Sequence, residues 1–240
     1  MMKNYKAILF DMDGTLLPMD MKEFTNGYFI LLAKKLAPFS IPTDVLVSTI
    51  WKGTELMARN DGSKRNDTVF WEFFDKEVPG HDIVKLRACC DEFYGKEFKE
   101  AKCFTKDNPL AKEAVSLARK KAPIVALATN PLFPMDGQKT RMEWVGLKPE
   151  DFDLVTSYET DSYCKPNPEY FISVCERLNV DPADCLMIGN DENEDMYACT
   201  KAGIDGYLIT DTMIPSKEHA WDGPKGSFRD MMEYLNNLKC

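Results

Sequence analysis

From residue 109 onward, short apolar runs alternate with segments of helical periodicity, and this alternation limits the possible folds more than any other feature of the chain. Four of the apolar runs are predicted to be strands: residues 123–128, 152–157, 185–189 and 206–210. Helices are predicted between them, near residues 110–121, 136–145, 168–179 and 192–202. Strands that alternate with helices pair in parallel and are covered on both faces, which predicts an α/β fold.

A fifth apolar run, residues 5–10, suits the same sheet although it is far from the others in sequence. The region between, residues 18–106, shows helix spacing and no convincing strand. Apolar residues that repeat in this way include Phe24, Tyr28, Leu32 and Leu36. The simplest architecture is an α/β core made of residues 1–17 and 107–240, with the helical residues 18–106 inserted after the first strand.

Composition excludes several classes of partner. The chain has 240 residues, of which 44% are hydrophobic, so a buried core is expected. Its net charge of −9 argues against nucleic acid or an anionic membrane as a partner, because phosphate polymers are bound by clustered Lys and Arg. No basic stretch followed by an apolar run opens the sequence, so a secretory signal is not expected. No apolar run approaches the roughly 20 residues of a membrane-spanning helix. The eight cysteines lack CxxC or Cys/His spacing, which predicts reduced thiols and a cytoplasmic protein.

The first predicted strand ends in the stretch DMDGT, which contains Asp11, Asp13, Gly14 and Thr15. Ligands of open parallel sheets bind beyond the carboxyl ends of the strands, so these residues are candidates for chemistry. The stretch alone also suits a polar turn. Two carboxylates this close are stable together when a divalent cation offsets their charge, and such oxygen ligands suit Mg²⁺. Asp11 is therefore predicted to be a nucleophile, and Gly14 would let the backbone approach a phosphate.

Polar residues also follow the next two strands. Thr129 and Asn130 offer a hydroxyl, an amide and backbone N–H groups to phosphate oxygens, although an ordinary strand-end turn is the favoured interpretation of this pair taken alone. Lys165 precedes a helix that is expected to start with Asn167 as its N-cap and Pro168 as its first residue. A lone lysine is usually a solvated loop residue. A lysine held at this edge would instead neutralise a nucleophile and a transferring phosphoryl group.

After the fourth strand, the stretch GNDENED contains Asn190, Asp191 and Asp195. The two aspartates are four residues apart, so on a helix they would share one face. Acidic residues in a first helical turn also complement the helix dipole without any metal. The functional interpretation is that Asp191 completes a metal site begun by Asp11, with Asp195 supporting it.

The four groups occur in the order DxDGT, TN, KP and GND with a second Asp four residues on, and this combination resembles the haloacid dehalogenase-like (HAD) superfamily. The resemblance covers the α/β core. It implies a Rossmann-like three-layer core with a parallel sheet, plus a mostly α-helical cap domain formed by residues 18–106. It also implies a Mg²⁺-dependent phosphatase that hydrolyses a small phosphorylated metabolite, as a monomer or a homodimer.

The resemblance also implies a role for each residue. Asp11 would attack a phosphate monoester to form an aspartyl phosphate, and Asp13 would act as general acid and then as general base. Asp11, the main-chain carbonyl of Asp13 and Asp191 would hold Mg²⁺, with Asp195 and Asn190 beside them. Many relatives place the metal-binding Asp directly after the Gly, whereas Asn190 intervenes here. The phosphoryl oxygens would be held by Gly14, Thr15, Thr129, Asn130 and Lys165.

Several alternatives remain open. A phosphomutase uses the same catalytic groups, and a phosphonate hydrolase would need a cap lysine as a Schiff base. The lysines available for this are Lys22, Lys34, Lys35 and Lys52. A halide hydrolase is disfavoured, because those relatives need neither the metal site nor the carboxylate at Asp13. A catalytically silent binding or regulatory module is a different class, which the loss of Asp11, Asp13 or Lys165 would have favoured.

Overall fold

The computed structural model describes residues 3–239 and has a parallel sheet of six strands in the order β3-β2-β1-β4-β5-β6. The strands are β1 (Ala7–Phe10), β2 (Ile124–Leu127), β3 (Leu154–Val155), β4 (Cys185–Gly189), β5 (Asp205–Ile209) and β6 (Lys225–Gly226). β1 lies inside the sheet, where Ala7 pairs with Ile124 of β2 and with Cys185 of β4. The predicted parallel sheet is confirmed. The short edge strand β6 was not predicted.

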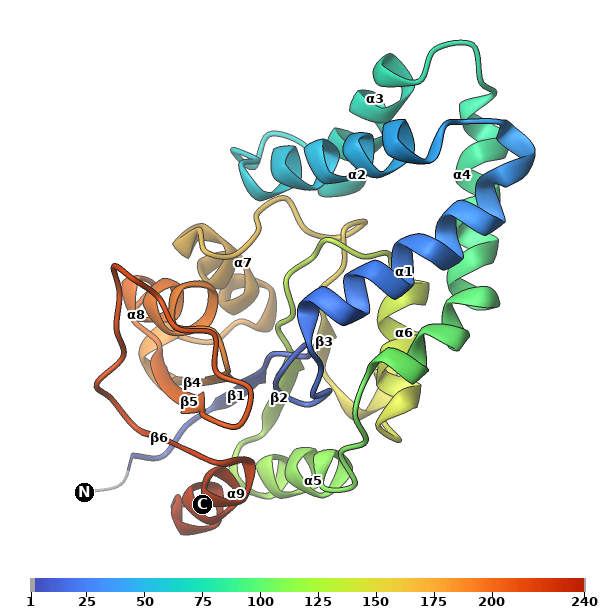
Figure 1. The fold of residues 1–240 in the computed structure, drawn as a ribbon. Helices are drawn as coiled ribbons and strands as arrows, with labels where there is room; N and C mark the ends of the chain where they lie inside the picture. The colour runs from blue at the N-terminus through green and yellow to red at the C-terminus, as the bar shows by residue number, and fades with distance from the viewer. Residues whose placement is uncertain (1–2, 240) are drawn as a thin grey trace.

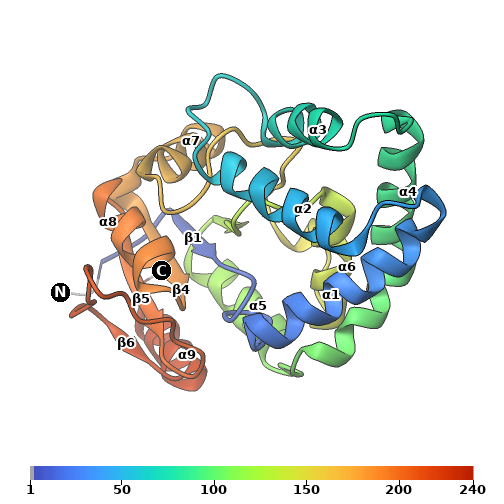
Figure 2. The same cartoon turned by 45° about the horizontal axis from the view of Figure 1, so that its top comes forward.

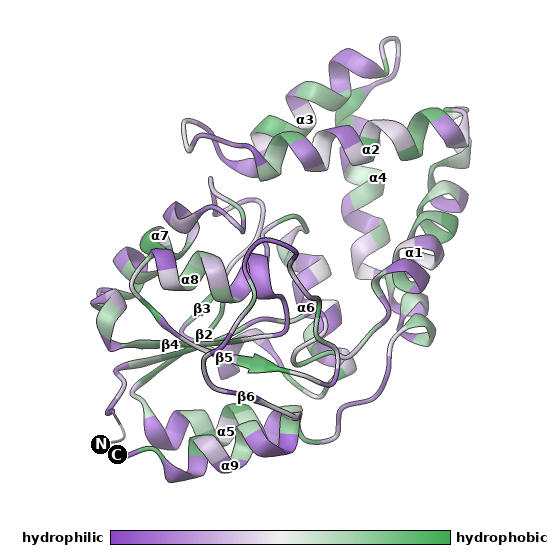
Figure 3. Ribbon diagram, turned by 60° about the vertical axis from the view of Figure 1, so that its left-hand side comes forward, coloured by the Kyte–Doolittle hydropathy of each residue, from purple (hydrophilic) through white to green (hydrophobic). Residues whose placement is uncertain are grey.

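Helices cover both faces of the sheet, as predicted (Figure 3). α5 (Ala111–Lys121) and α9 (Phe228–Asn237) lie on one face, and α7 (Pro168–Leu178) and α8 (Ala198–Lys201) lie on the other. Side chains alternate along β1, so that Ile8 and Phe10 join the core beneath α5 and α9, whereas Ala7 and Leu9 join the core beneath α7 and α8. All four side chains are fully buried, which explains the continuous apolar run in this strand.

A helical insertion separates β1 from β2 and stands beside the sheet (Figures 1 and 2). Its α-helices are α1 (Met21–Leu36), α2 (Thr43–Ala58), α3 (Asn66–Glu77) and α4 (Ile83–Gly95). It also contains the short 3-10 helices η1 (Ala37–Phe39) and η2 (Glu97–Phe104). The chain enters and leaves this insertion at one place, because Met19 pairs with Thr105 and the Lys106 N–H donates to the Pro18 carbonyl at 2.8 Å. The exact division at residues 18 and 106 stays a prediction.

The remaining helices connect the strands. They are α6 (Met135–Trp144), the 3-10 helices η3 (Pro149–Asp151) and η4 (Pro182–Asp184), and the π-helix η5 (Glu192–Tyr197). The single helix predicted over residues 192–202 is thus a π-helix followed by the short α8, which corrects that prediction.

Within residues 3–239, no helix combines the length and apolar character needed to cross a membrane. The seven cysteines of this range are free thiols.

Candidate active site

Asp11 follows β1 directly and continues its hydrogen bonding, since its N–H donates to the Ile188 carbonyl at 2.9 Å. This hydrogen bond holds the backbone of Asp11 at the carboxyl end of the sheet. The Asp11 side chain points toward the segment before α7. There the Asp11 Oδ1 accepts a hydrogen bond from the Lys165 Nζ at 2.9 Å. The structure therefore brings together two of the predicted residues, although 154 positions separate them in the chain.

Lys165 is fully buried between two carboxylates. Its Nζ also donates to Asp195 Oδ1 at 2.6 Å, and its side chain is only 1% exposed. Burial alone would lower the pKa of Lys165, but Asp11 and Asp195 outweigh it and hold that pKa well above its ordinary value. The predicted start of α7 is confirmed, because the Asn167 side chain accepts from the Glu169 N–H at 3.0 Å and Pro168 is the first helical residue. This capped helix start fixes the segment that carries Lys165.

The turn after β4 positions Asp191 differently from the sequence prediction. Asp191 is the N-cap of η5 and not a member of the helix, so it does not share a helical face with Asp195. Its Oδ1 accepts from the N–H groups of Asn193 and Glu194 at 2.7 and 2.8 Å. The carboxylate of Asp195 points back instead, and its Oδ2 accepts from the N–H groups of Asn190 and Asp191 at 2.9 and 3.0 Å. Asp195 thus stabilises the turn with one carboxylate oxygen and pairs with Lys165 through the other.

Asn190 packs tightly against the glycine of the first turn. Gly14 has a φ of +85°, and a Cβ added there would lie 2.3 Å from the Asn190 Nδ2, so only glycine suits this position. The Asn190 Oδ1 accepts from the Thr15 hydroxyl at 3.2 Å, and its Nδ2 donates to the Thr212 carbonyl at 2.7 Å. These contacts tie the turn after β1 to the loop after β5. Both amide atoms of Asn190 are therefore occupied by the scaffold.

The phosphate-binding candidates after β2 also reach this edge of the sheet. The Asn130 Nδ2 donates to the Lys165 carbonyl at 3.3 Å and to Glu194 Oε2 at 2.9 Å, while its Oδ1 is buried without a partner in the described chain. Thr129 is 1% exposed, and its carbonyl accepts from the Tyr170 hydroxyl at 2.8 Å. Within residues 3–239, no hydrogen bond joins the Thr129 hydroxyl to the other predicted site residues. Its predicted contact with phosphate stays untested.

Arg141 is the main functional candidate that the sequence did not reveal. It lies on α6, is 0% exposed, and its guanidinium forms an ion pair with the Asp13 Oδ2. A second guanidinium nitrogen donates to Gln138 Oε1, one helical turn earlier. The only signal in the sequence was that Gln138 and Arg141 are three residues apart, which is common on helix surfaces. Their approach to Asp13 depends on the packing of α6 against a turn 128 residues away.

Three buried polar atoms around this pair have no hydrogen-bond partner in the described chain. They are Asp13 Oδ1, Gln138 Nε2 and Arg141 Nε. Unpaired buried polar atoms are rare, because each one costs the free energy of its lost hydration. One oxygen of Asp13 is thus held by Arg141 while the other is unpaired. The unpaired oxygen is the one with which Asp13 could exchange a proton with a ligand.

Negative charge exceeds positive charge around Lys165. Burial raises the pKa of Asp11, and the nearby Asp195 and Asp13 raise it further against the opposing effect of Lys165. Burial likewise raises the pKa of Asp191, and it raises the pKa of Glu194 to about 7. Glu194 belongs to the stretch GNDENED, whose acidic residues also suit the first turn of a helix. A cluster of crowded carboxylates with one lysine favours the binding of a cation.

The donor atoms fit Mg²⁺. Asp11 and Asp191 each use Oδ1 for a hydrogen bond, and within residues 3–239 their Oδ2 atoms accept none. In the same range, no group of three His, Cys, Asp or Glu side chains is arranged to hold a metal by itself. Mg²⁺ accepts main-chain carbonyl and water oxygens beside one or two carboxylates, so two side chains are sufficient. Mg²⁺ binding by Asp11, Asp13 and Asp191 remains a prediction.

Residues 5–203 match the family model described as haloacid dehalogenase-like hydrolase, which spans most of the chain. The protein has the fold of that class of hydrolase and carries acidic and basic side chains at the carboxyl ends of its strands. The chain belongs to the haloacid dehalogenase-like hydrolase family. The resemblance inferred from the four sequence groups is confirmed.

The chain is also similar to individual proteins, and the solved structures among them share its fold. The chain is 26% identical over 210 residues to a phosphoglycolate phosphatase of Nitrosospira multiformis, covering 85% of this chain and 82% of that protein. A solved structure of a predicted phosphoglycolate phosphatase from Haemophilus somnus 129PT has a TM-score of 0.61 at 20% identity, covering 98% and 99% of the two chains. The HAD hydrolase YfnB of Bacillus subtilis, solved bound to magnesium, has a TM-score of 0.59 at 20% identity, covering 98% and 100%.

Proposed function

We propose that this protein is a Mg²⁺-dependent phosphatase that hydrolyses a small phosphate monoester through an aspartyl-phosphate intermediate. The observation that carries the proposal is the contact of 2.9 Å between Asp11 and the buried Lys165, with the carboxylate of Asp13 two residues further on. The similarity to a phosphoglycolate phosphatase supports a phosphate ester as the substrate. Asp13 favours this activity over halide hydrolysis, which needs no second carboxylate.

In the first step, the carboxylate of Asp11 attacks the phosphorus atom and the bond from phosphorus to the leaving oxygen breaks. Asp13 gives a proton to that oxygen, so the alcohol leaves uncharged. The ammonium of Lys165 offsets negative charge on the phosphoryl group, whose oxygens would be held by Gly14, Thr15, Thr129 and Asn130. Lys165 is ready for this role because it is charged and already in contact with Asp11.

In the second step, Asp13 takes a proton from a water molecule that attacks the phosphorus atom of the aspartyl phosphate. Phosphate leaves and the carboxylate of Asp11 is restored. Arg141 keeps the Asp13 side chain in place during both proton transfers, since its ion pair occupies only Oδ2. Asp11, the Asp13 carbonyl and Asp191 would hold Mg²⁺, with Asp195 and Asn190 beside them. The bound ion supplies positive charge that offsets the crowded carboxylates and the phosphate.

We also propose that residues 18–106 act as a cap over a core formed by residues 1–17 and 107–240. The start of α3 supports this, because the N–H groups of Asn66 and Asp67 donate to the carbonyls of Asp161 and Tyr158, both at 2.9 Å. The Asn66 Nδ2 also contacts the Pro131 carbonyl at 3.3 Å, next to the predicted phosphate-binding residues. These contacts cover the site from one side and favour the exclusion of water.

The side chain of Cys164 also contacts the insertion. It is 1% exposed, lies 3.2 Å from the Asn66 Nδ2, and burial raises its pKa. A buried, protonated thiol is a packing group and a weak nucleophile. The cap lysines offer little support for a phosphonate hydrolase, since Lys22, Lys34 and Lys52 are exposed and Lys35 pairs with Glu92 and Glu97.

The activity is tested with para-nitrophenyl phosphate and a panel of small phosphate esters, with added Mg²⁺ and with a chelator. We expect hydrolysis that requires Mg²⁺. Mg²⁺ should also raise the melting temperature of the wild type by mass action, and this effect should be lost in Asp191→Asn but kept in the exposed control Asp222→Asn. If no ester is hydrolysed faster by the wild type than by Asp11→Asn, the proposed function is wrong.

The Arg141→Met variant is expected to lower kcat by about 10- to 100-fold with a smaller change in KM, because Asp13 would lose the contact that orients it. Arg141→Lys should recover part of kcat, since it keeps the charge but not the planar guanidinium that reaches Asp13 and Gln138 together. Steady-state kinetics test this, with the exposed Arg229→Met on α9 as the matched control. A folded Arg141→Met enzyme with the wild-type kcat would contradict a positioning role.

A further inference from the structure

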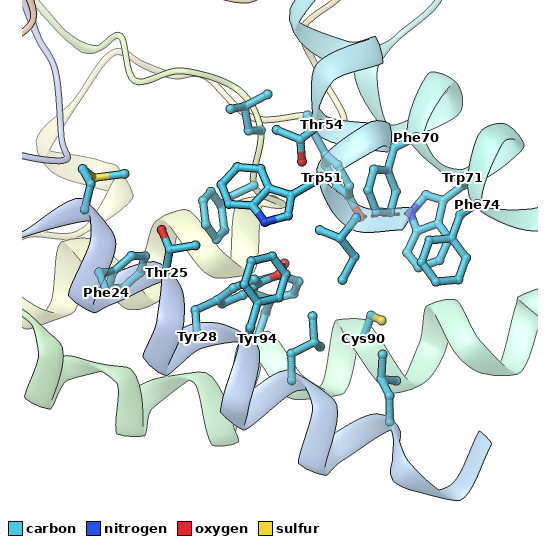
Figure 4. A pocket seen from close by; sticks show the side chains of 18 residues that line it. Phe24, Thr25, Tyr28, Trp51, Thr54, Phe70, Trp71, Phe74, Cys90 and Tyr94 are labelled. Carbon is cyan, nitrogen blue, oxygen red and sulfur yellow. Dashed lines mark hydrogen bonds between the residues drawn. The ribbon is translucent and has the colours of Figure 1, made fainter. Parts of the chain in front are cut away.

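An apolar cavity of about 160 Å³ lies between the helical insertion and the loops that follow β2 and β3 (Figure 4). Helices α1, α2, α3 and α4 contribute most of its wall, and Leu132, Phe133 and Tyr158 close it from the side of the sheet. Most of the lining side chains are aromatic, none carries a charge, and Thr25 and Thr54 supply hydroxyl groups. The cavity therefore offers shape and apolar surface to a ligand but no counter-charge.

The cavity adjoins the candidate active site. Leu132 and Phe133 come shortly after Asn130, and the Leu132 N–H donates to the Asn130 carbonyl at 2.8 Å. The guanidinium of Arg141 lies 4.3 Å from the centre of the Phe133 ring, while the same guanidinium pairs with Asp13. One face of Phe133 thus supports the catalytic pair, and the residue also forms a wall of the cavity. A phosphate ester bound at Asp11 would direct its leaving group to this region.

Two large apolar side chains of the cavity are exposed to solvent. Trp51 is 52% exposed and Met21 is 43% exposed, although both line an otherwise buried apolar region. Trp51 lies among the other lining side chains and near Thr54 in Figure 4. Exposed apolar surface that borders a cavity is typical of a site that a ligand covers. A ligand in the cavity would remove both side chains from water.

We propose that this cavity binds the leaving group of the substrate, and that the substrate is a phosphate monoester of an aromatic alcohol about one ring in size. A cavity of about 150 Å³ lined by apolar side chains is known to bind benzene, so the size is suitable. A charged leaving group such as glycolate would meet no cation among the lining residues, because Arg141 is already paired with Asp13. The inference rests on the proposed phosphatase function and adds the class of its leaving group.

The test compares benzyl phosphate with methyl phosphate and 2-phosphoglycolate. Benzyl and methyl phosphate are both esters of primary alcohols, so they differ mainly in the aromatic ring. We expect kcat/KM for benzyl phosphate to exceed that for each of the others by about tenfold or more. Thr54→Phe, which fills the cavity, and Trp51→Ala, which removes part of its wall, should each lower the ratio of benzyl to methyl phosphate about tenfold. The exposed control Ile30→Ala on α1 should leave this ratio unchanged.

The outcomes separate the two proposals. Equal rates for benzyl and methyl phosphate, or a preference for 2-phosphoglycolate, would overturn the inference and leave the phosphatase function intact. If no ester is hydrolysed, the phosphatase function fails, and binding of benzyl alcohol then tests the cavity through tryptophan fluorescence. Saturable binding that Thr54→Phe removes would support the cavity as a site for an aromatic ring. An absence of binding would show that it is only a packing defect of the insertion.

Discussion

The Asp11→Asn variant is expected to lose at least about 1,000-fold in kcat for every phosphate ester that the wild type hydrolyses. An amide oxygen is a poor nucleophile, and the substitution also removes the charge that pairs with Lys165 at 2.9 Å. The variant is expected to stay folded, because an amide has nearly the same size and relieves the crowding of carboxylates around Lys165. Steady-state kinetics and thermal unfolding of the same preparation measure the two effects.

The matched control for this variant is Asp107→Asn, since the Asp107 side chain is 83% exposed. It should keep the activity and the melting temperature of the wild type. Activity of Asp11→Asn within tenfold of the wild type would mean that another group attacks the phosphorus atom. If Asp11→Asn loses activity and also unfolds, the loss of activity would be attributed to the loss of the folded structure. Both measurements are therefore needed.

The Lys165→Met variant is expected to lower the free energy of unfolding by about 3–5 kcal/mol, because it leaves the buried carboxylates of Asp11 and Asp195 without their counter-ion. Catalysis should fall as well, since the charge that offsets the phosphoryl group is gone. Chemical denaturation followed by circular dichroism gives the stability, and kinetics on the folded fraction give the activity.

Lys112→Met is the control for this second variant, because Lys112 is exposed on α5. It should change the free energy of unfolding by less than about 0.5 kcal/mol. Wild-type stability in Lys165→Met would indicate that Asp11 and Asp195 do not need the lysine when the protein is folded. Wild-type activity in that variant would remove Lys165 from the proposed mechanism.

The positions of the strands were largely predictable, because a strand that is buried on both faces consists of consecutive apolar residues, which can be recognised in the sequence. The run at residues 185–189 is a strand with the same bounds in the structure. The run at residues 152–157 is shorter than predicted, since only Leu154 and Val155 pair with β2. The details of the turn after β4 were less predictable. Asp191 caps a π-helix, and the spacing of four residues to Asp195 did not reveal this.

The sequence by itself determined the α/β fold and the edge of the sheet where the chemistry was expected. Both follow from local periodicity together with one general rule, that parallel strands carry their carboxyl ends to the same edge. Asp11, Lys165 and Asp195 meet at that edge as expected. Their catalytic roles remain predictions that the variants above test.

Only the tertiary structure decided which side chains from the helices reach this edge. Arg141 and Gln138 look like ordinary surface residues in the sequence, yet Arg141 is completely buried against Asp13. The aromatic cavity likewise depends on how α1 to α4 pack over the loops after β2 and β3. The contact between Arg141 and Asp13 joins residues that are 128 positions apart, and the contact between Trp71 and Tyr158 in the cavity wall joins residues that are 87 positions apart. No local pattern encodes them, because the orientation of a helix on a sheet is set by packing across the whole core.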